Sequence, residues 1–202
     1  LNLPLAQIEL VKALAKTGKP MVGVVAQGRP RIISAIEEEL DGILLSFYPG
    51  DMGGLAIGKI LFGDVNPSGK LPITYPRYAN DLVTYDHKGT DEIGGPFGFN
   101  PQFEFGHGLS YTTFSYSDLK LSQESYLRND PIEISINLKN TGSRTGVETV
   151  QLYVRDDVAS ITPPVKRLRA FQRVELEAGA SKTVTFTLNS DELSFIGRDN
   201  EW

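Results

Sequence analysis

Residues 132–139 read IEISINLK, so that apolar side chains alternate strictly with polar ones. This period of two is typical of an antiparallel strand with one face in a hydrophobic core and the other in water. The alternation recurs at 150–154 (VQLYV) and at 184–188 (VTFTL), and turn sequences precede these two strands at 140–142 (NTG) and 177–179 (EAG). Short strands at this spacing predict an immunoglobulin-like β-sandwich.

The first third of the chain has a different period. Apolar residues recur at helical spacing between Leu5 and Thr17, and Pro20 to Ala26 forms a continuous apolar run typical of a strand buried on both faces. The same reasoning predicts a helix from Ile32 to Leu40, a second buried strand from Gly42 to Phe47, and a third helix from Asp51 to Phe62. This order of elements predicts a layered α/β structure with a parallel sheet.

These patterns divide the chain into three parts. Residues 1–77 are interpreted as the C-terminal part of an α/β domain, because two parallel strands cannot bury their apolar residues without further strands. Residues 78–110, without sustained periodicity, are interpreted as an interdomain linker. Residues 111–202 form the β-sandwich, with about five recognisable strands where such a fold has ~7. The chain stops at Glu201-Trp202. We therefore expect truncation at both ends.

Charge and composition exclude several classes of partner. Twenty Lys and Arg stand against 25 Asp and Glu, giving a net charge of −5 and no broad positive field for nucleic acid. No apolar run approaches the ~18 residues of a membrane span, so no membrane partner is expected. With no cysteine and two histidines, neither a metal site nor a cofactor is predicted. Exposed strand edges favour association with the missing parts or as a homo-oligomer.

Three longer motifs carry a resemblance. Residues 49–57 (PGDMGGLAI) and 61–77 (LFGDVNPSGKLPITYPR) closely resemble the end of the second domain of family 3 glycoside hydrolases. Residues 105–114 (FGHGLSYTTF) resemble the stretch that leads into the fibronectin type III-like domain of that family. Shorter matches follow in the order of the family: Gly18-Lys19-Pro20, Gly28-Arg29-Pro30, Asn140-Thr141-Gly142 and Pro164-Val165-Lys166. One departure is Asp51-Met52, where the family commonly has Gln-Glu.

The resemblance implies an α/β sandwich domain, a linker and a fibronectin type III-like domain. It also implies exo-acting, retaining hydrolysis of β-linked sugars, most closely that of a β-glucosidase, acting on β-linked oligosaccharides or glucosides. The family's nucleophilic Asp lies on an N-terminal (β/α)8 barrel and its acid/base Glu on the second domain, and both correspond to positions before Leu1. No catalytic, cofactor-binding or metal-binding residue is therefore assigned to residues 1–202.

The expected partners are the missing barrel and the upstream part of the α/β domain. We expect the chain alone to be inactive, and the intact protein to be secreted or periplasmic. The alternative is a non-catalytic carbohydrate-binding or scaffold module that works alone.

Several side chains have both a functional and a structural interpretation. We interpret Asp51 as an N-cap of the third predicted helix, because an anionic side chain there can cap free amide groups and oppose the helix dipole. An acidic residue in this position also argues against a phosphate cradle. Gly63 to Lys70 does not fit a P-loop, because the spacing is one residue too long and Leu71 stands where Ser or Thr is needed. The stretch also follows a predicted helix rather than a strand. Glu37–Glu39 is interpreted as a solvated helix face, and His107 as a packed, hydrogen-bonded residue rather than an acid/base group. His87 and His107 are the only histidines, and without cysteine a metal site at either is not expected.

The linker holds the remaining candidates. Its acidic residues could approach a sugar site on a missing domain, a weak hypothesis because fold analogy does not place a carboxylate. These residues are Asp86, Asp91, Glu92 and Glu104. Its aromatic residues could stack on sugar rings, but we favour a role in fixing the linker against both domains. They are Phe97, Phe99, Phe103, Phe105 and Tyr111.

Overall fold

Helix α1 (Leu5–Ala15) begins directly after Pro4, as predicted, and Gly18 closes its C-terminal turn at φ +66°.

The computed structural model describes residues 1–81, 84–92 and 98–198. Its first compact unit comprises Leu1–Val65, Leu71–Tyr85 and Glu92–His107, and its second Asn66–Lys70, Asp86–Asp91 and Gly108–Trp202. Ile8 and Val11 of α1 pack against the core of the first unit, which confirms the predicted amphipathic face.

Strands β1 (Val22–Val25) and β2 (Gly42–Leu45) pair in parallel, with Val22 opposite Gly42 and Val25 opposite Leu45. The predicted strands and their parallel pairing are thus confirmed. Burial on both faces is not, because Val22 is 52% and Val24 42% exposed. Among the described residues, Ile43 and Leu45 of β2 pack against the core of the unit but no residue of β1 does, so the face that carries Val22 and Val24 lacks the covering layer that a buried parallel strand needs.

The predicted helix from Ile32 to Leu40 is wrong. Ile32 forms a parallel bridge with Asn2, and only a 3-10 turn, η1 (Glu37–Glu39), follows. The backbone bonds in this stretch are mostly of the tighter kind, from Ile36 to Ile33 and from Leu40 to Glu37. Ile33 and Ile36, three residues apart, are both buried in the core, and a 3-10 turn places such a pair on one side.

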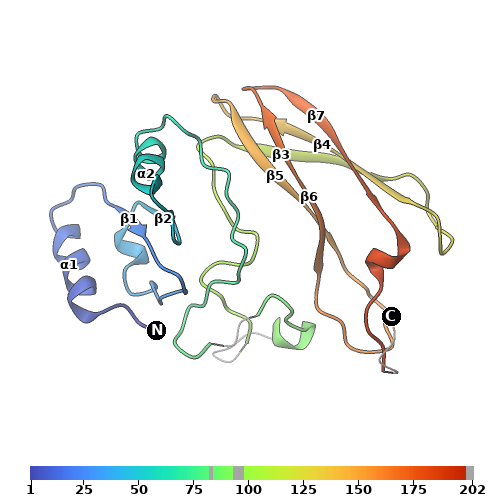
Figure 1. Cartoon of the computed structure of the whole chain (residues 1–202), viewed down its shortest axis with the longest axis horizontal. Coiled ribbons are helices and arrows are strands. Elements are labelled where there is room, and N and C mark those ends of the chain that lie inside the picture. Colours follow the sequence, from blue (N-terminus) through green and yellow to red (C-terminus); the bar gives the residue numbers. More distant parts are fainter. Residues whose placement is uncertain (82–83, 93–97, 199–202) are drawn as a thin grey trace. The chain divides into compact units, whose positions relative to one another are not determined.

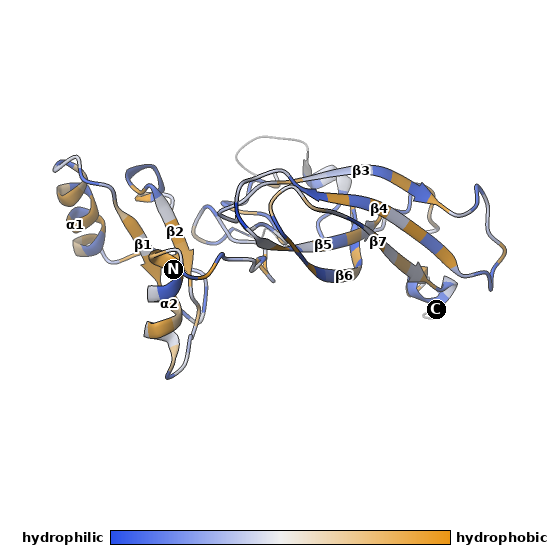
Figure 2. Ribbon diagram, turned by 90° about the horizontal axis from the view of Figure 1, so that it is seen from above, coloured by the Kyte–Doolittle hydropathy of each residue, from blue (hydrophilic) through white to orange (hydrophobic). Residues whose placement is uncertain are grey.

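Helix α2 (Gly53–Leu61) confirms the third predicted helix, but the N-cap role of Asp51 is wrong. The cap position is Met52, no side chain caps the helix, and Asp51 lies exposed in the preceding turn. Gly50 adopts φ +69° and accepts a bond from the Gly53 amide, so the turn delays the helix by two residues. Figure 2 shows how apolar residues dominate α1, β1, β2 and α2.

The rest of the first unit is irregular and packs around Tyr75. Tyr75 is fully buried with Ile33, Ile36 and Leu71. It bridges Phe103, whose carbonyl accepts a 2.8 Å bond from the Tyr75 amide. The irregular character predicted for residues 78–110 holds for the described ones, apart from the short 3-10 turn η2 (Gly89–Glu92).

The described residues of the second unit form five strands, in line with the approximate count from the sequence. They are β3 (Phe114–Leu121), β4 (Ile132–Asn140), β5 (Gly146–Val154), β6 (Arg167–Leu176) and β7 (Ser181–Leu188), followed by the 3-10 turn η3 (Ser190–Leu193). One antiparallel sheet has the order β3-β4-β7 and the other pairs β5 with β6 (Figure 1).

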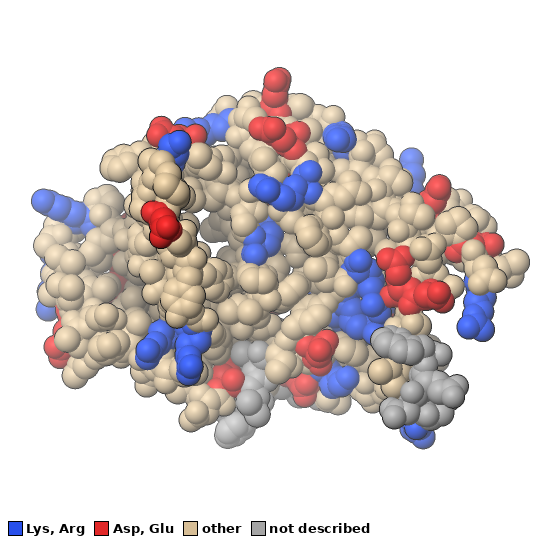
Figure 3. Space-filling model, viewed as in Figure 1, with Lys and Arg blue, Asp and Glu red and all other residues tan. Residues whose placement is uncertain are grey.

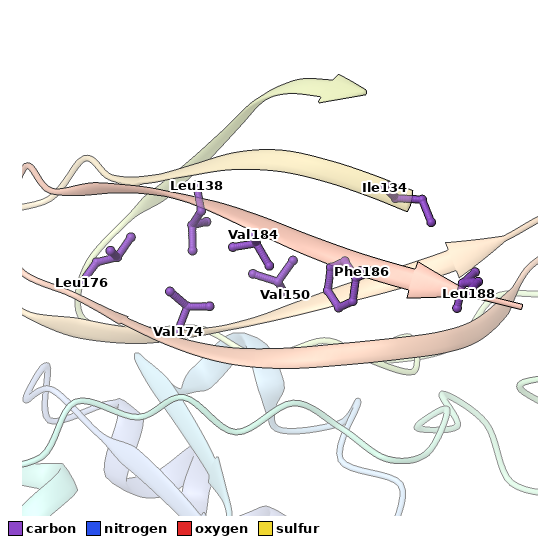
Figure 4. Close-up of a cluster of buried hydrophobic side chains, with 8 residues drawn as sticks. All are labelled: Ile134, Leu138, Val150, Val174, Leu176, Val184, Phe186 and Leu188. Carbon is purple, nitrogen blue, oxygen red and sulfur yellow. The ribbon is translucent and has the colours of Figure 1, made fainter. Parts of the chain in front are cut away.

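The core of this sandwich comes from the alternating positions. Figure 4 shows its eight buried side chains converging between the two sheets: Ile134, Leu138, Val150, Val174, Leu176, Val184, Phe186 and Leu188. Along β4 and β7 the intervening polar residues point to the other face, which is seen as alternating bands in Figure 2. The predicted β-sandwich and its period of two are therefore confirmed.

Asn140 organises the turn between β4 and β5. Its side chain is fully buried. Its oxygen accepts bonds from the Thr112 hydroxyl at 2.7 Å and the Gly142 amide at 3.1 Å. Its amide donates to the carbonyls of Arg144 at 2.8 Å and Leu176 at 3.0 Å. The residue that opens the predicted NTG turn thus makes four hydrogen bonds, which is the full capacity of a buried amide side chain.

Two further findings bear on partners. No helix among the described residues is both long enough and apolar enough to cross a membrane. Within the same residues, no group of three or more His, Cys, Asp or Glu side chains could hold a metal ion.

Candidate functional site

The most notable charged cluster of the second unit is centred on Glu148 of β5. Glu148 is 8% exposed, and its Oε1 atom lies 3.1 Å from Nζ of Lys70 and accepts a 3.2 Å bond from the Tyr116 hydroxyl. Lys70 also donates to the Gly108 carbonyl at 2.8 Å. A buried carboxylate needs such partners, because an uncompensated charge in the interior costs several kcal/mol.

The electrostatics of this cluster keep Tyr116 neutral. Tyr116 is 46% exposed, and the partial burial of its ring, followed by the charge of Glu148 and the hydrogen bond to it, raises the pKa of Tyr116 above its ordinary value. A phenol is already protonated at neutral pH, and the raised pKa extends to higher pH the range in which Tyr116 can donate its hydrogen bond to Glu148. Lys70 and Tyr116 thus supply one carboxylate oxygen of Glu148 with a cation and a hydrogen-bond donor. Such an arrangement is suited to holding a structure in place.

A second polar cluster lies in the first unit around the Tyr75 hydroxyl. It donates to the Arg31 carbonyl at 2.6 Å and accepts from the Gln27 amide at 2.7 Å, while Gln27 accepts from the Arg31 amide at 3.2 Å. Burial raises the pKa of Tyr75. The ring meets Phe103 edge-on at 6.0 Å. These contacts fix the loop after β1 to the irregular segment of the same unit.

The two histidines occupy different environments. His107 is exposed, and its ring stacks on Phe103 at 5.2 Å. His87 is buried, and its carbonyl accepts a bond from the Val165 amide at 3.0 Å. His87 belongs to the second unit and His107 to the first.

The predicted acidic candidates are mostly exposed. Asp86, Asp91 and Glu104 all face solvent, and Asp91 accepts a bond from the Lys88 amide at 2.8 Å. The side chain of Glu92 lies outside the described residues. Glu38 and Glu39 are also exposed, although on a 3-10 turn rather than a helix. Figure 3 shows acidic and basic groups interspersed on the face in view.

Several linker aromatics contact other side chains of their own unit. Phe105 packs against Tyr85 at 4.4 Å, and Phe103 contacts both Tyr75 and His107. Tyr111 lies 6.0 Å from the Arg144 guanidinium, Phe99 is half-buried, and Phe97 lies outside the described residues. Rings engaged in this way support the structural interpretation over stacking on sugars.

Sequence reasoning missed the Glu148 cluster. The pattern did contain an indication, since Glu148 has the same parity as Val150 and Leu152 and therefore falls on an inward-facing position of β5. A charge at such a position calls for a buried partner. The partner itself, Lys70, lies 78 positions away, and no local pattern connects the two. The same contact argues against a phosphate-binding role for Lys70, because the carboxylate already neutralises it.

Fold and site together define a class of protein in which an α/β unit is followed by a fibronectin type III-like sandwich. The chain belongs to glycosyl hydrolase family 3: residues 1–111 match the glycosyl hydrolase family 3 C-terminal domain, and residues 148–202 match the fibronectin type III-like domain. The family membership and fold class predicted from the sequence are thereby confirmed.

Named relatives support the same family assignment. A β-xylosidase of Formosa agariphila is 44% identical over 96% of the chain and 28% of the relative. A periplasmic β-glucosidase of Salmonella typhimurium is 38% identical over 96% of the chain and 27% of its own length. Among solved structures, a β-glucosidase of Erythrobacter marinus matches with a TM-score of 0.93 and 42% identity, over 100% of the chain and 27% of that protein. The chain thus spans just over a quarter of these relatives.

Proposed function

We propose that residues 1–202 are the C-terminal part of an exo-acting, retaining β-glycosidase that hydrolyses β-linked sugars from the non-reducing end. The observation that carries this proposal is the match of residues 1–111 and 148–202 to the two domain models, together with relatives named β-glucosidase and β-xylosidase that align with 96% of the chain. Because the chain corresponds to only about a quarter of those relatives, its role is proposed within a larger protein.

We further propose that neither reacting carboxylate lies in this chain. Retaining hydrolysis needs two carboxyl groups about 5 Å apart, one as nucleophile and one as acid/base. Among the described residues, the buried carboxylate is Glu148, and the groups that contact it are an ammonium and a phenol. Of the linker carboxylates, Asp86, Asp91 and Glu104 are exposed, and Asp81 is half-buried. These environments favour a supporting role, in which the chain helps to keep the spacing of reacting groups held elsewhere.

A chimera tests the proposal. The matching quarter of the Erythrobacter marinus β-glucosidase would be replaced by this chain, and the product assayed on aryl β-glucoside and aryl β-xyloside. We expect hydrolysis by the chimera, with preference for the glucoside, and none by residues 1–202 alone. The Erythrobacter protein lacking the replaced quarter is the matched control.

Three outcomes would count against the proposal. Activity of the chain alone would overturn the placement of the carboxylates. A folded chimera that hydrolyses neither substrate would overturn the supporting role. Retention of the isolated chain on a β-glucan column would favour the alternative of an autonomous carbohydrate-binding module.

We also propose a secreted or periplasmic location for the intact protein. The support is the similarity to the periplasmic β-glucosidase of Salmonella typhimurium. Cell fractionation of the source organism, with detection of the chain by antibody, tests it, and recovery with cytoplasmic markers would contradict it.

A further inference from the structure

The segment Asn66-Pro67-Ser68-Gly69-Lys70 belongs to the second unit, although the residues on both sides of it, up to Val65 and from Leu71, belong to the first. It has no regular secondary structure, so its own backbone does not hold it in place. What fixes it must be its contacts with the sandwich.

Asn66 makes the most complete set of these contacts. Its oxygen accepts from the Ser110 hydroxyl and from the Tyr111 amide, both at 2.8 Å. Its nitrogen donates to the Thr145 carbonyl at 3.1 Å. The side chain therefore joins the approach to β3 with the turn before β5. An amide suits the position because it needs both an acceptor and a donor.

Ser68 provides the second anchor. Its carbonyl accepts from the Thr149 hydroxyl at 3.1 Å, and its hydroxyl oxygen accepts from the Arg173 guanidinium at 3.0 Å. Thr149 and Arg173 are paired across β5 and β6 in the antiparallel register. The segment thus contacts both strands of the smaller sheet.

Lys70 is the third anchor, through Glu148 and the Gly108 carbonyl. Its side chain and that of Glu148 are 18% and 11% exposed, so the ion pair is largely shielded from water. Shielding makes the loss of one partner costly, because the other charge is then left buried.

Two glycines next to the segment leave the space that close packing in this region requires. A Cβ atom on Gly108 would collide with the Gly69 carbonyl oxygen. One on Gly146 would lie 2.8 Å from the Asn66 nitrogen and 2.6 Å from the Thr112 methyl group. Both positions need glycine because the segment, or a residue beside it, occupies the space.

We infer that β5, β6 and the approach to β3 form a peptide-binding site whose ligand is the chain's own Asn66–Lys70 segment, and that the sandwich depends on this bound segment for its stability. The β-sandwich is then an assembly of residues 108–202 with a peptide from the preceding part of the chain. Cutting the chain at residue 110 or 111 would remove the ligand. This dependence holds whether or not the chain supports glycoside hydrolysis, since its measurement involves no substrate.

The test uses the full chain carrying N66A together with K70M. Its matched control carries N129A and K59M, which change the same residue types at exposed positions of the β3–β4 loop and of α2. We expect the Tyr111 amide, which donates to Asn66, to exchange its hydrogen about tenfold faster or more in the test variant, with earlier urea unfolding of the sandwich. The control should match the parent chain in both measurements.

Equal exchange at Tyr111 and equal unfolding midpoints in test and control would overturn the inference. If the double variant does not fold while the control does, the single variant N66D decides. It keeps the acceptor oxygens for Ser110 and Tyr111 but loses the donor to Thr145. An unfolding midpoint for N66D below that of the parent chain supports the inference, and a midpoint equal to that of the parent overturns it.

Discussion

Tyr75 shows how burial changes the chemistry of a single side chain. Its pKa is raised in the folded chain because the ring is fully buried. In the unfolded chain the pKa returns to about 10. The folded state therefore retains the proton at pH values where the unfolded state has lost it. The stability contributed by Tyr75 is complete below about pH 10 and is lost as the pH rises through the folded value.

We therefore expect the free energy of unfolding of the first unit to decrease above about pH 10, by at most ~1.4 kcal/mol per pH unit for this group. Y75F should show a smaller decrease over the same range, because it has no phenolic proton. Urea unfolding at several pH values measures both slopes. Y48F changes a tyrosine that is 83% exposed and serves as the control. Equal slopes for Y75F and the parent chain would contradict the argument.

At the scale of a single element, the backbone conformation of a glycine decides whether its replacement by alanine stabilises or destabilises the fold. Gly58 lies inside α2 with open space where an added methyl group would lie, whereas Gly179 adopts φ +77° in the turn between β6 and β7. Alanine is the better helix former and loses less conformational entropy on folding, but it is strained at positive φ. The same substitution should therefore have opposite effects at the two positions.

We expect G58A to stabilise the first unit by about 0.5–1 kcal/mol and G179A to destabilise the second by about 1 kcal/mol. Each variant acts as the control for the other, because the chemical change is identical. Thermal or urea unfolding of the full chain measures both. Effects of the same sign would show that the local conformations assigned to these glycines are incorrect.

At the scale of the whole molecule, both units expose apolar side chains, but α1 places two of them next to each other on one face. The sandwich encloses a continuous core between two sheets. On α1, by contrast, Leu10 and Leu14 are 58% and 48% exposed, and on the two-stranded sheet Val22 and Val24 are similarly exposed. Leu10 and Leu14 lie one helical turn apart on the same face. An apolar face of this kind favours association.

We expect the purified chain to associate with increasing concentration, as measured by light scattering or sedimentation. L10K together with L14K should shift the chain towards the monomer. The control pair L119K and L127K removes two exposed leucines of the sandwich, at 66% and 79% exposure, and should leave the association unchanged. A parent chain that remains monomeric across the concentration range would contradict this expectation.

The sequence by itself determined the elements and the class of protein. Period-two alternation located β4, β5 and β7, helical spacing located α1 and α2, and the long motifs gave the family, because each of these features is local or nearly so. The pattern failed at residues 32–40, where a tertiary bridge from Ile32 to Asn2 and burial of Ile33 and Ile36 replaced the helix.

Only the tertiary structure decided which distant residues meet. Lys70 and Glu148 pair across 78 positions, and Asn66 and Ser68 find partners as far away as Arg173. The physical reason is that side-chain periodicity specifies which face of an element is buried, but not which segment will cover that face. That choice depends on shape, charge and hydrogen-bond partners that come together only when the chain has folded.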